Sequence, residues 1–138
     1  ADPRQFAKIE KVNLTAVYRL IRSLEPLLRA SDAGRAIHLT TSLATAPKAF
    51  WGSYAATKAA AEVLVRCWAD EIESTPIRAT VLDPGRMRTR LRAQAYPGED
   101  PETLPHPSEI APLIVDLARG DQMPPGVVSF KDWKASKA

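Results

Sequence analysis

The stretch SYAATKAAAEVLVRCWADEIE, residues 53–73, decides the fold because it predicts a long helix whose apolar side chains cover a wide arc. Ser53 is a good helix N-cap. At about 100° per residue the apolar positions fall on two sides of the helix. This apolar arc is wider than packing against a single sheet face requires. We therefore expect this helix to pack on a sheet with one side and on another helix, from a partner subunit, with the other. The first side carries Tyr54, Lys58, Ala61, Val65, Trp68 and Ile72; the opposite side carries Ala56, Ala60, Val63 and Cys67; the narrow polar face carries Glu62, Arg66, Asp70 and Glu73.

Tyr54 and Lys58 lie four residues apart and share a helix face. A lysine charge beside a tyrosine favours the phenolate and lowers a pKa that is ordinarily about 10. A phenol tuned in this way can exchange a proton with an alcohol or carbonyl oxygen near neutral pH. The alternative is a boundary tyrosine beside a solvated lysine, since this spacing is common in ordinary helices.

Predicted strands flank this helix. Residues 36–41 read as a short strand that ends in hydroxyl side chains, and residues 77–82 read as a second strand that ends at Asp83-Pro84-Gly85. An earlier helix is predicted over residues 6–28, with a kink or a loosened last turn near Pro26. Its apolar stripe contains Ile9, Ala16, Leu20, Leu24 and Leu27, with Asn13 on the same side.

The last third of the chain predicts one more helix and one more strand. We expect Ser108 to cap a helix over 109–118 that ends at Gly120, a strand over 127–130, and a frayed lysine-rich tail. Helices thus alternate with strands, which is typical of an α/β fold with right-handed crossovers and a parallel sheet.

Composition narrows the class of protein. The 138 residues suffice for one domain, and 45% hydrophobic and 25% charged residues are ordinary for a soluble protein. The net charge of +3 is too small to argue for nucleic acid, and no apolar run is long enough to span a bilayer. Cys67 is the only cysteine, which favours a reducing, cytoplasmic location. His38 and His106 have no neighbours at metal-ligand spacing, so we expect no metal.

Residues 86–107 are rich in arginine and proline and predict a mobile loop with one short helix. Alternate arginines could hold a cofactor pyrophosphate or an anionic substrate, or they could belong to a solvated lid. Trp51 could line a substrate pocket or brace this loop. The arginines are Arg86, Arg88, Arg90 and Arg92.

Several motifs in register resemble the short-chain dehydrogenase/reductase family. They are VNLTAVYRLIRSLEPLL, GRAIHLTTS, YAATKAAAEVLVRCWADEI and IRATVLDPGRMRT, and the match runs from Ile9 to Leu117. The resemblance implies that residues 1–138 are a single partial domain, the C-terminal part of a doubly wound, Rossmann-type parallel sheet with flanking helices. The family's glycine-rich dinucleotide turn comes earlier and is absent, so we expect either a fragment of a longer protein or a lost first half, inactive as it stands.

The resemblance also implies catalytic roles. Tyr54 resembles the family's acid/base, and Lys58 resembles the lysine that lowers the tyrosine pKa and holds the nicotinamide ribose. Asn13 resembles the asparagine that bends its helix and seats a water in the proton relay. The family's serine, which hydrogen-bonds the substrate oxygen, matches Thr41 by spacing and Ser42 by chemistry, and both remain candidates.

Cofactor contacts are implied as well. Pro84-Gly85 resembles the turn after the family's sixth strand. Met87 and Thr89 fall where a backbone group and a hydroxyl hold the nicotinamide carboxamide. Tyr54 and Lys58 would also contact the cofactor.

The function implied is hydride transfer between NAD or NADP, which the sequence does not distinguish, and a carbonyl or alcohol substrate. A different class of function is a catalytically silent relative that acts as a binding or scaffold protein through its helix–helix interface. In either case we expect a homodimer or homotetramer formed through the helices that carry Asn13 and Tyr54.

Overall fold

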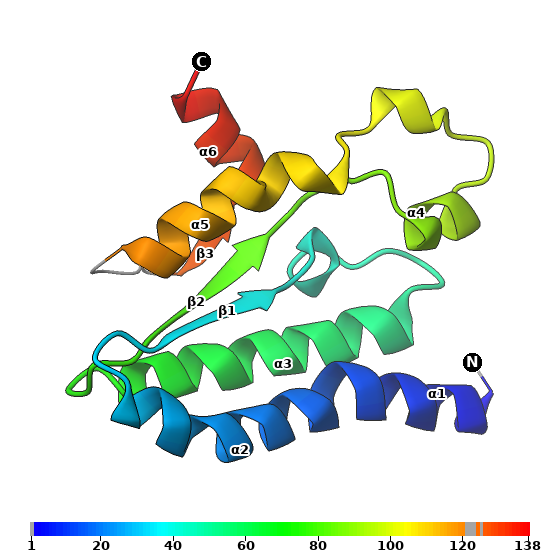
Figure 1. Cartoon of the computed structure of the whole chain (residues 1–138). Helices are drawn as coiled ribbons and strands as arrows, with labels where there is room; N and C mark the ends of the chain where they lie inside the picture. Colours follow the sequence, from blue (N-terminus) through cyan, green and yellow to red (C-terminus); the bar gives the residue numbers. More distant parts are fainter. Residues whose placement is uncertain (1, 121–123, 125) are drawn as a thin grey trace.

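The computed structural model describes residues 2–120, 124 and 126–138. Three strands form a parallel sheet in the order β1-β2-β3. Figure 1 shows α1, α2 and α3 on one side of this sheet and α5 and α6 on the other. The predicted α/β class with a parallel sheet is confirmed.

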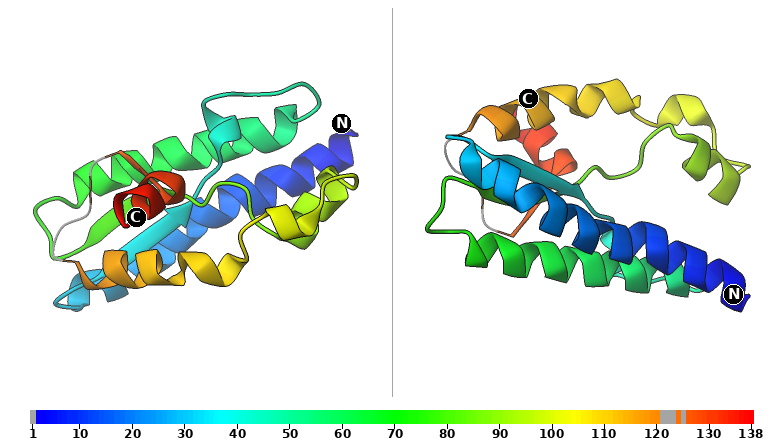
Figure 2. Two further views of the ribbon diagram at one scale, coloured as in Figure 1. Left: turned by 90° about the horizontal axis from the view of Figure 1, so that it is seen from above. Right: turned by 60° about the horizontal axis from the view of Figure 1, so that its bottom comes forward.

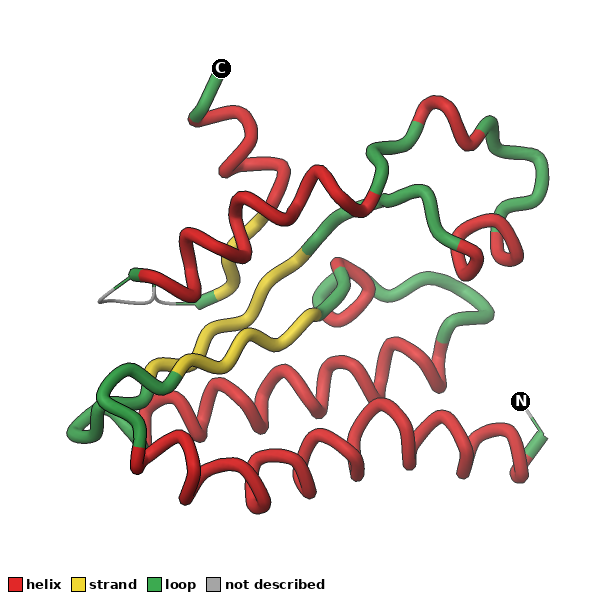
Figure 3. Tube along the Cα trace, viewed as in Figure 1, coloured by secondary structure: helices red, strands yellow, loops and turns green. Residues whose placement is uncertain are grey.

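The helices and strands follow the predicted order. The strands pair in parallel, with Ile37 opposite Thr80 and Leu82 opposite Val128. Figure 3 shows helices alternating with strands along the chain. The strands are β1 (Arg35–Leu39), β2 (Arg78–Asp83) and β3 (Val127–Ser129); the α-helices are α1 (Pro3–Glu10), α2 (Ala16–Ala30), α3 (Gly52–Glu71), α4 (Arg90–Ala95), α5 (Ala111–Arg119) and α6 (Phe130–Ser136); the short η elements are η1 (Lys11–Thr15), η2 (Ser42–Ala44), η3 (Pro101–Thr103) and η4 (Pro107–Ile110).

The first long helix contains one wide turn. Residues Lys11–Thr15 form a π-helical segment between α1 and α2, and Pro26 lies inside α2, which continues to Ala30. A π turn inserts one extra residue and so moves the buried face of the following helix by one position. The predicted stripe is therefore wrong after the π turn: Leu20, Leu24 and Leu27 are 56%, 43% and 69% exposed. The next residues along, Ile21 and Leu28, face the core instead.

Several predicted ends and caps are also wrong. Trp51, not Ser53, is the N-cap of α3, because the Trp51 carbonyl already accepts a hydrogen bond from the Ala55 amide. The predicted helix over 109–118 begins as a 3₁₀ turn capped by His106 rather than by Ser108. The tail expected to fray forms α6. Gly120 is the C-cap of α5, as predicted.

The α3 helix lies beside the first helix on one face of the sheet (Figure 2). Its predicted inner side is confirmed, since Ala61, Val65, Trp68 and Ile72 are buried. The indole of Trp68 also donates to the Glu25 carboxylate of α2 at 3.0 Å. The α1 and α2 helices of the same chain thus contact α3, while the side expected to face a partner helix, with Ala56, Ala60, Val63 and Cys67, is exposed.

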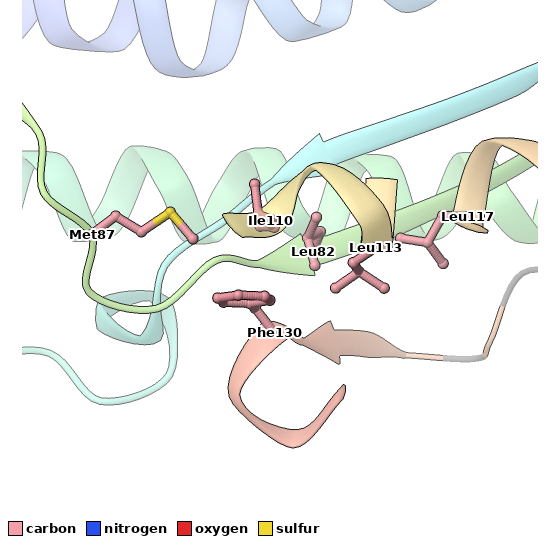
Figure 4. Close-up of a cluster of buried hydrophobic side chains, with 6 residues drawn as sticks. All are labelled: Leu82, Met87, Ile110, Leu113, Leu117 and Phe130. Carbon is pink, nitrogen blue, oxygen red and sulfur yellow. The ribbon is translucent and has the colours of Figure 1, made fainter. Parts of the chain in front are cut away.

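A second apolar cluster fills the other side of the sheet. Figure 4 shows these side chains between β2, α5 and the start of α6. Burying them fixes α5 and α6 over β2, from which the chain enters the loop of residues 86–107. The buried members are Leu82, Met87, Ile110, Leu113, Leu117 and Phe130.

Candidate active site

The first two turns of α3 lie at the carboxyl-terminal end of the sheet, where Figure 1 also places α4. In open parallel α/β sheets, ligands bind beyond this end of the strands. Tyr54 and Lys58 stand on these two turns, and both side chains are half-buried. The Tyr54 ring contacts the Trp51 ring edge-on, with 5.4 Å between ring centroids.

Lys58 reaches from α3 to the end of β1. Its Nζ donates to the Leu39 carbonyl oxygen at 2.6 Å, and burial lowers its pKa. Burial raises the pKa of the Tyr54 hydroxyl. The expectation that Lys58 lowers the pKa of Tyr54 is therefore wrong for this structure, in which the loss of water around the phenol decides the direction.

Asn13 lies in the π-helical segment and is tied to α3. Its Nδ2 donates to the Thr57 hydroxyl at 3.2 Å, and that hydroxyl donates in turn to the carbonyl oxygens of Ser53 and Tyr54 at 2.8 and 3.0 Å. The π turn is a local irregularity of the helix at Asn13, the residue expected to bend it. Thr57, which lies between Tyr54 and Lys58 in the sequence, therefore joins Asn13 to the first turns of α3, whereas the hydrogen bond of Lys58 goes to the end of β1.

The two candidate hydroxyls follow β1 in the turn that begins η2. Thr41 is half-buried, and its hydroxyl oxygen accepts from the Leu43 amide at 3.3 Å. Ser42 is exposed. A hydroxyl oxygen that accepts one bond still carries a proton to donate.

The residues after β2 differ in whether their surroundings leave room for a ligand. Gly85 has a φ of +70°, its amide donates to the Asp83 carboxylate at 2.9 Å, and nothing lies within 4 Å of where a Cβ would stand. The Pro84-Gly85 turn is therefore open at the end of β2. The Met87 side chain instead lies in the apolar core, and the Thr89 hydroxyl caps α4 by accepting from the Arg92 amide at 3.1 Å.

Polar contacts hold the loop of residues 86–107 together. Arg92 makes two hydrogen bonds to the Glu99 carboxylate, at 2.7 and 2.9 Å. Arg88 donates to the carbonyl oxygens of Pro101 and Leu104, at 3.0 and 3.3 Å. Two of the four arginines thus bind other residues of the loop, and the loop's mobility remains a prediction.

His38 lies on β1 near Lys58. Burial and the positive charge of Lys58 lower its pKa to about 4, so the imidazole is neutral at pH 7. Among the described residues, no group of three or more metal-ligating side chains comes together. No helix in the described part of the chain is long and apolar enough to cross a membrane.

Sequence reasoning missed three contributors to this region. Glu62 was assigned to a polar surface, but it is 5% exposed and its carboxylate accepts from the Thr40 hydroxyl at 2.9 Å. Its angular position next to the inner stripe could have revealed this burial. Thr57 lies between the two predicted catalytic residues, and this position in the sequence could have identified it. Tyr96, which stacks on Trp51, carries no signal in its local sequence.

Comparisons with known proteins agree with this geometry. The chain is 38% identical over 120 residues to the uncharacterized oxidoreductase YciK of Escherichia coli K12, covering 87% of this chain and 47% of that protein. A short chain dehydrogenase from Salmonella enterica serovar Typhi CT18 superposes with a TM-score of 0.86 at 36% identity, covering 94% of this chain and 53% of the other.

A further structure, from E. coli CFT073, was solved in complex with NADPH and is assigned as a short chain dehydrogenase. It superposes with a TM-score of 0.87 at 35% identity, covering 94% of this chain and 54% of the other. The chain thus spans about half the length of the relatives it matches. The short chain dehydrogenase family itself matches residues 1–100, so this chain belongs to that family.

Proposed function

We propose that the protein transfers a hydride between NAD(P) and a carbonyl or alcohol substrate, with Tyr54 as the acid and base. The observation that supports this best is the placement of Tyr54 and Lys58 on the first two turns of α3, at the carboxyl-terminal end of the sheet. Asn13 bonds Thr57 between them, and Lys58 bonds the Leu39 carbonyl oxygen at the end of β1. Family membership and the NADPH bound to a relative of similar fold support the same reaction class.

The residues present fit the nicotinamide half of such a cofactor. Lys58 uses one of its three N–H groups on the Leu39 carbonyl oxygen, which leaves donors for the ribose hydroxyls. The turn at Gly85 is open where the strand ends, and Thr89 follows it. A bound nicotinamide would supply or accept the hydride.

Tyr54 manages the proton in this proposal. Because burial raises its pKa, the phenol is protonated at neutral pH and can give its proton to a carbonyl oxygen during reduction. We favour Thr41 over Ser42 as the second donor to that oxygen. Thr41 is half-buried, and its oxygen accepts from Leu43, so its proton is free to donate.

The experiment compares Tyr54→Phe with the unchanged protein, made as its gene encodes it, with NADH and NADPH and a panel of aldehydes and ketones. We expect turnover to fall at least about a hundredfold while cofactor binding, followed by fluorescence, is retained. Alcohol oxidation by the unchanged protein should rise toward alkaline pH, since the phenolate base forms only there. Retained turnover in Tyr54→Phe would refute the assignment, and cofactor binding without turnover by the unchanged protein would favour the scaffold alternative.

The same assay decides between the two hydroxyls. Thr41→Ala should lower kcat by about a hundredfold, as the loss of one oxyanion donor does. Thr41→Ser should restore most of it, and Ser42→Ala should have little effect. The opposite ranking would assign the role to Ser42.

We also propose that a second copy of the chain packs against the outer side of α3. Ala56, Ala60, Val63 and Cys67 are exposed there, and Val63 is 57% exposed. An apolar helix face left in water favours association. Val63→Glu should halve the mass measured by sedimentation if the unchanged protein is a dimer, and an unaltered mass would argue against this face.

A further inference from the structure

An aromatic stack connects the proposed acid to the loop of residues 86–107. The ring of Trp51 lies edge-on to that of Tyr54, and the Tyr96 ring lies nearly parallel to it, with 6.4 Å between centroids and 17° between planes. Tyr96 directly follows α4, whereas Trp51 precedes the first turn of α3. Trp51 therefore contacts both the proposed proton donor and the loop that follows β2.

The loop side of this stack is held by a paired charge. The guanidinium carbon of Arg92 lies 3.8 Å from the centre of the Tyr96 ring, and the same guanidinium makes its two hydrogen bonds to Glu99. A guanidinium that is both stacked and bidentate keeps a fixed orientation. Tyr96 is thus positioned between Trp51 and Arg92.

A cavity of about 300 Å³ adjoins the Tyr96 end of this stack, and its volume is near the lower end of the range for small-molecule sites. Two of the three arginines that line it are already paired with carboxylates, because Arg92 pairs with Glu99 and Arg88 pairs with Glu102 at 3.5 Å. An anionic substrate would have to compete with these two carboxylates. The lining residues are Arg88, Thr89, Arg90, Arg92, Ala93, Tyr96, Glu99, Pro101 and Leu104.

We infer that Trp51 and Tyr96 determine specificity by forming an aromatic wall for an uncharged carbonyl substrate that bears a flat, unsaturated group. Both rings are half-buried, so each keeps an open part on which such a group can pack. The contact between Trp51 and Tyr54 places this wall beside the ring whose hydroxyl meets the carbonyl oxygen in the proposed reaction. The inference rests on the proposed function and names its substrate class.

The test compares benzaldehyde with cyclohexanecarboxaldehyde, which is similar in size but not flat, in the protein as its gene encodes it. The measured quantity is the ratio of the two kcat/KM values, so that intrinsic reactivity cancels between variants. Trp51→Ala and Tyr96→Ala should each lower this ratio about twofold to tenfold, mainly through the KM of benzaldehyde. Trp51→Phe and Tyr96→Phe should keep the ratio, because they keep a ring.

Phe50 supplies a matched control, since it is an adjacent aromatic residue that is fully exposed. Phe50→Ala should leave the ratio unchanged. An unchanged ratio in both Trp51→Ala and Tyr96→Ala, or an equal fall in Phe50→Ala, would overturn the inference. A lower KM for the anionic 4-carboxybenzaldehyde than for benzaldehyde would overturn the assignment to uncharged substrates.

Failure of the proposed function gives a different result, the absence of turnover with any aldehyde, propanal included. In that case the wall is tested by binding alone, with benzamide and cyclohexanecarboxamide as unreactive analogues of the two shapes. Tryptophan fluorescence should report tighter binding of benzamide in the unchanged protein than in Tyr96→Ala. Equal binding of both amides would overturn the inference without reference to turnover.

Discussion

Two regions of the molecule depend on carboxylates: the contact between α3 and the end of β1, and the loop of residues 86–107. The carboxylates of the two regions differ in how far water reaches them. At the end of β1, the Glu62 carboxylate accepts from the Thr40 hydroxyl, and both residues are buried, at 5% and 6% exposure. In the loop, the paired side chains of Arg92 and Glu99 are 20% and 26% exposed. A polar group left without a partner costs more where water cannot replace that partner. The two regions should therefore respond very differently to the loss of one carboxylate.

The largest effect on stability is expected at Glu62. Glu62→Ala leaves the Thr40 hydroxyl buried without its acceptor and opens a small cavity, so the free energy of unfolding should fall by about 2 kcal/mol. Because Thr40 immediately precedes the candidate hydroxyls Thr41 and Ser42, the loss should also loosen this end of β1. Urea denaturation followed by circular dichroism measures the change.

Glu71 is the matched control for this prediction, because it lies on the same helix and is exposed. Glu71→Ala should change the free energy of unfolding by less than about 0.5 kcal/mol. Equal losses in the two variants would mean that burial does not distinguish the regions, and the comparison would fail.

What the sequence could predict depends on whether burial follows a local, periodic pattern. The inner stripe of α3 repeats at helical spacing, and Ala61, Val65 and Trp68 are buried as expected, because periodic burial against a sheet is a local signal. On α2 the same reasoning selected Leu20 and Leu24 rather than Ile21. A single π turn shifted the register, and hydrophobic periodicity alone does not encode such an insertion.

The candidate site was predictable only in part, for a related reason. Tyr54 and Lys58 share a short motif, and the helix places them on one face. The contact between Trp51 and Tyr96 joins residues 45 positions apart through a loop, where no periodicity exists. The pKa of Tyr54 also went against expectation, since its direction depends on the burial of the phenol rather than on the spacing of the motif.

A smaller effect is expected in the loop. Hydrogen bonds from Arg92 hold the pKa of Glu99 below its ordinary value, so this pair stabilises the loop at neutral pH and the contribution is lost as the pH falls through that lowered pKa. Glu99→Gln should leave global unfolding nearly unchanged. Amide hydrogen exchange over residues 90–104 should become faster by on the order of threefold, because water can replace part of the lost contact.

Glu102 separates the effect of this pair from a general effect of charge in the loop. Its side chain is 79% exposed and 3.5 Å from Arg88, so Glu102→Gln removes the same charge from a more exposed pair. We expect no measurable change in exchange for this variant, and raising the salt concentration should weaken the Glu99 contact only in part. If Glu99→Gln and Glu102→Gln accelerate exchange equally, Arg92 does not hold Tyr96 through Glu99, and the loop depends on its backbone contacts instead.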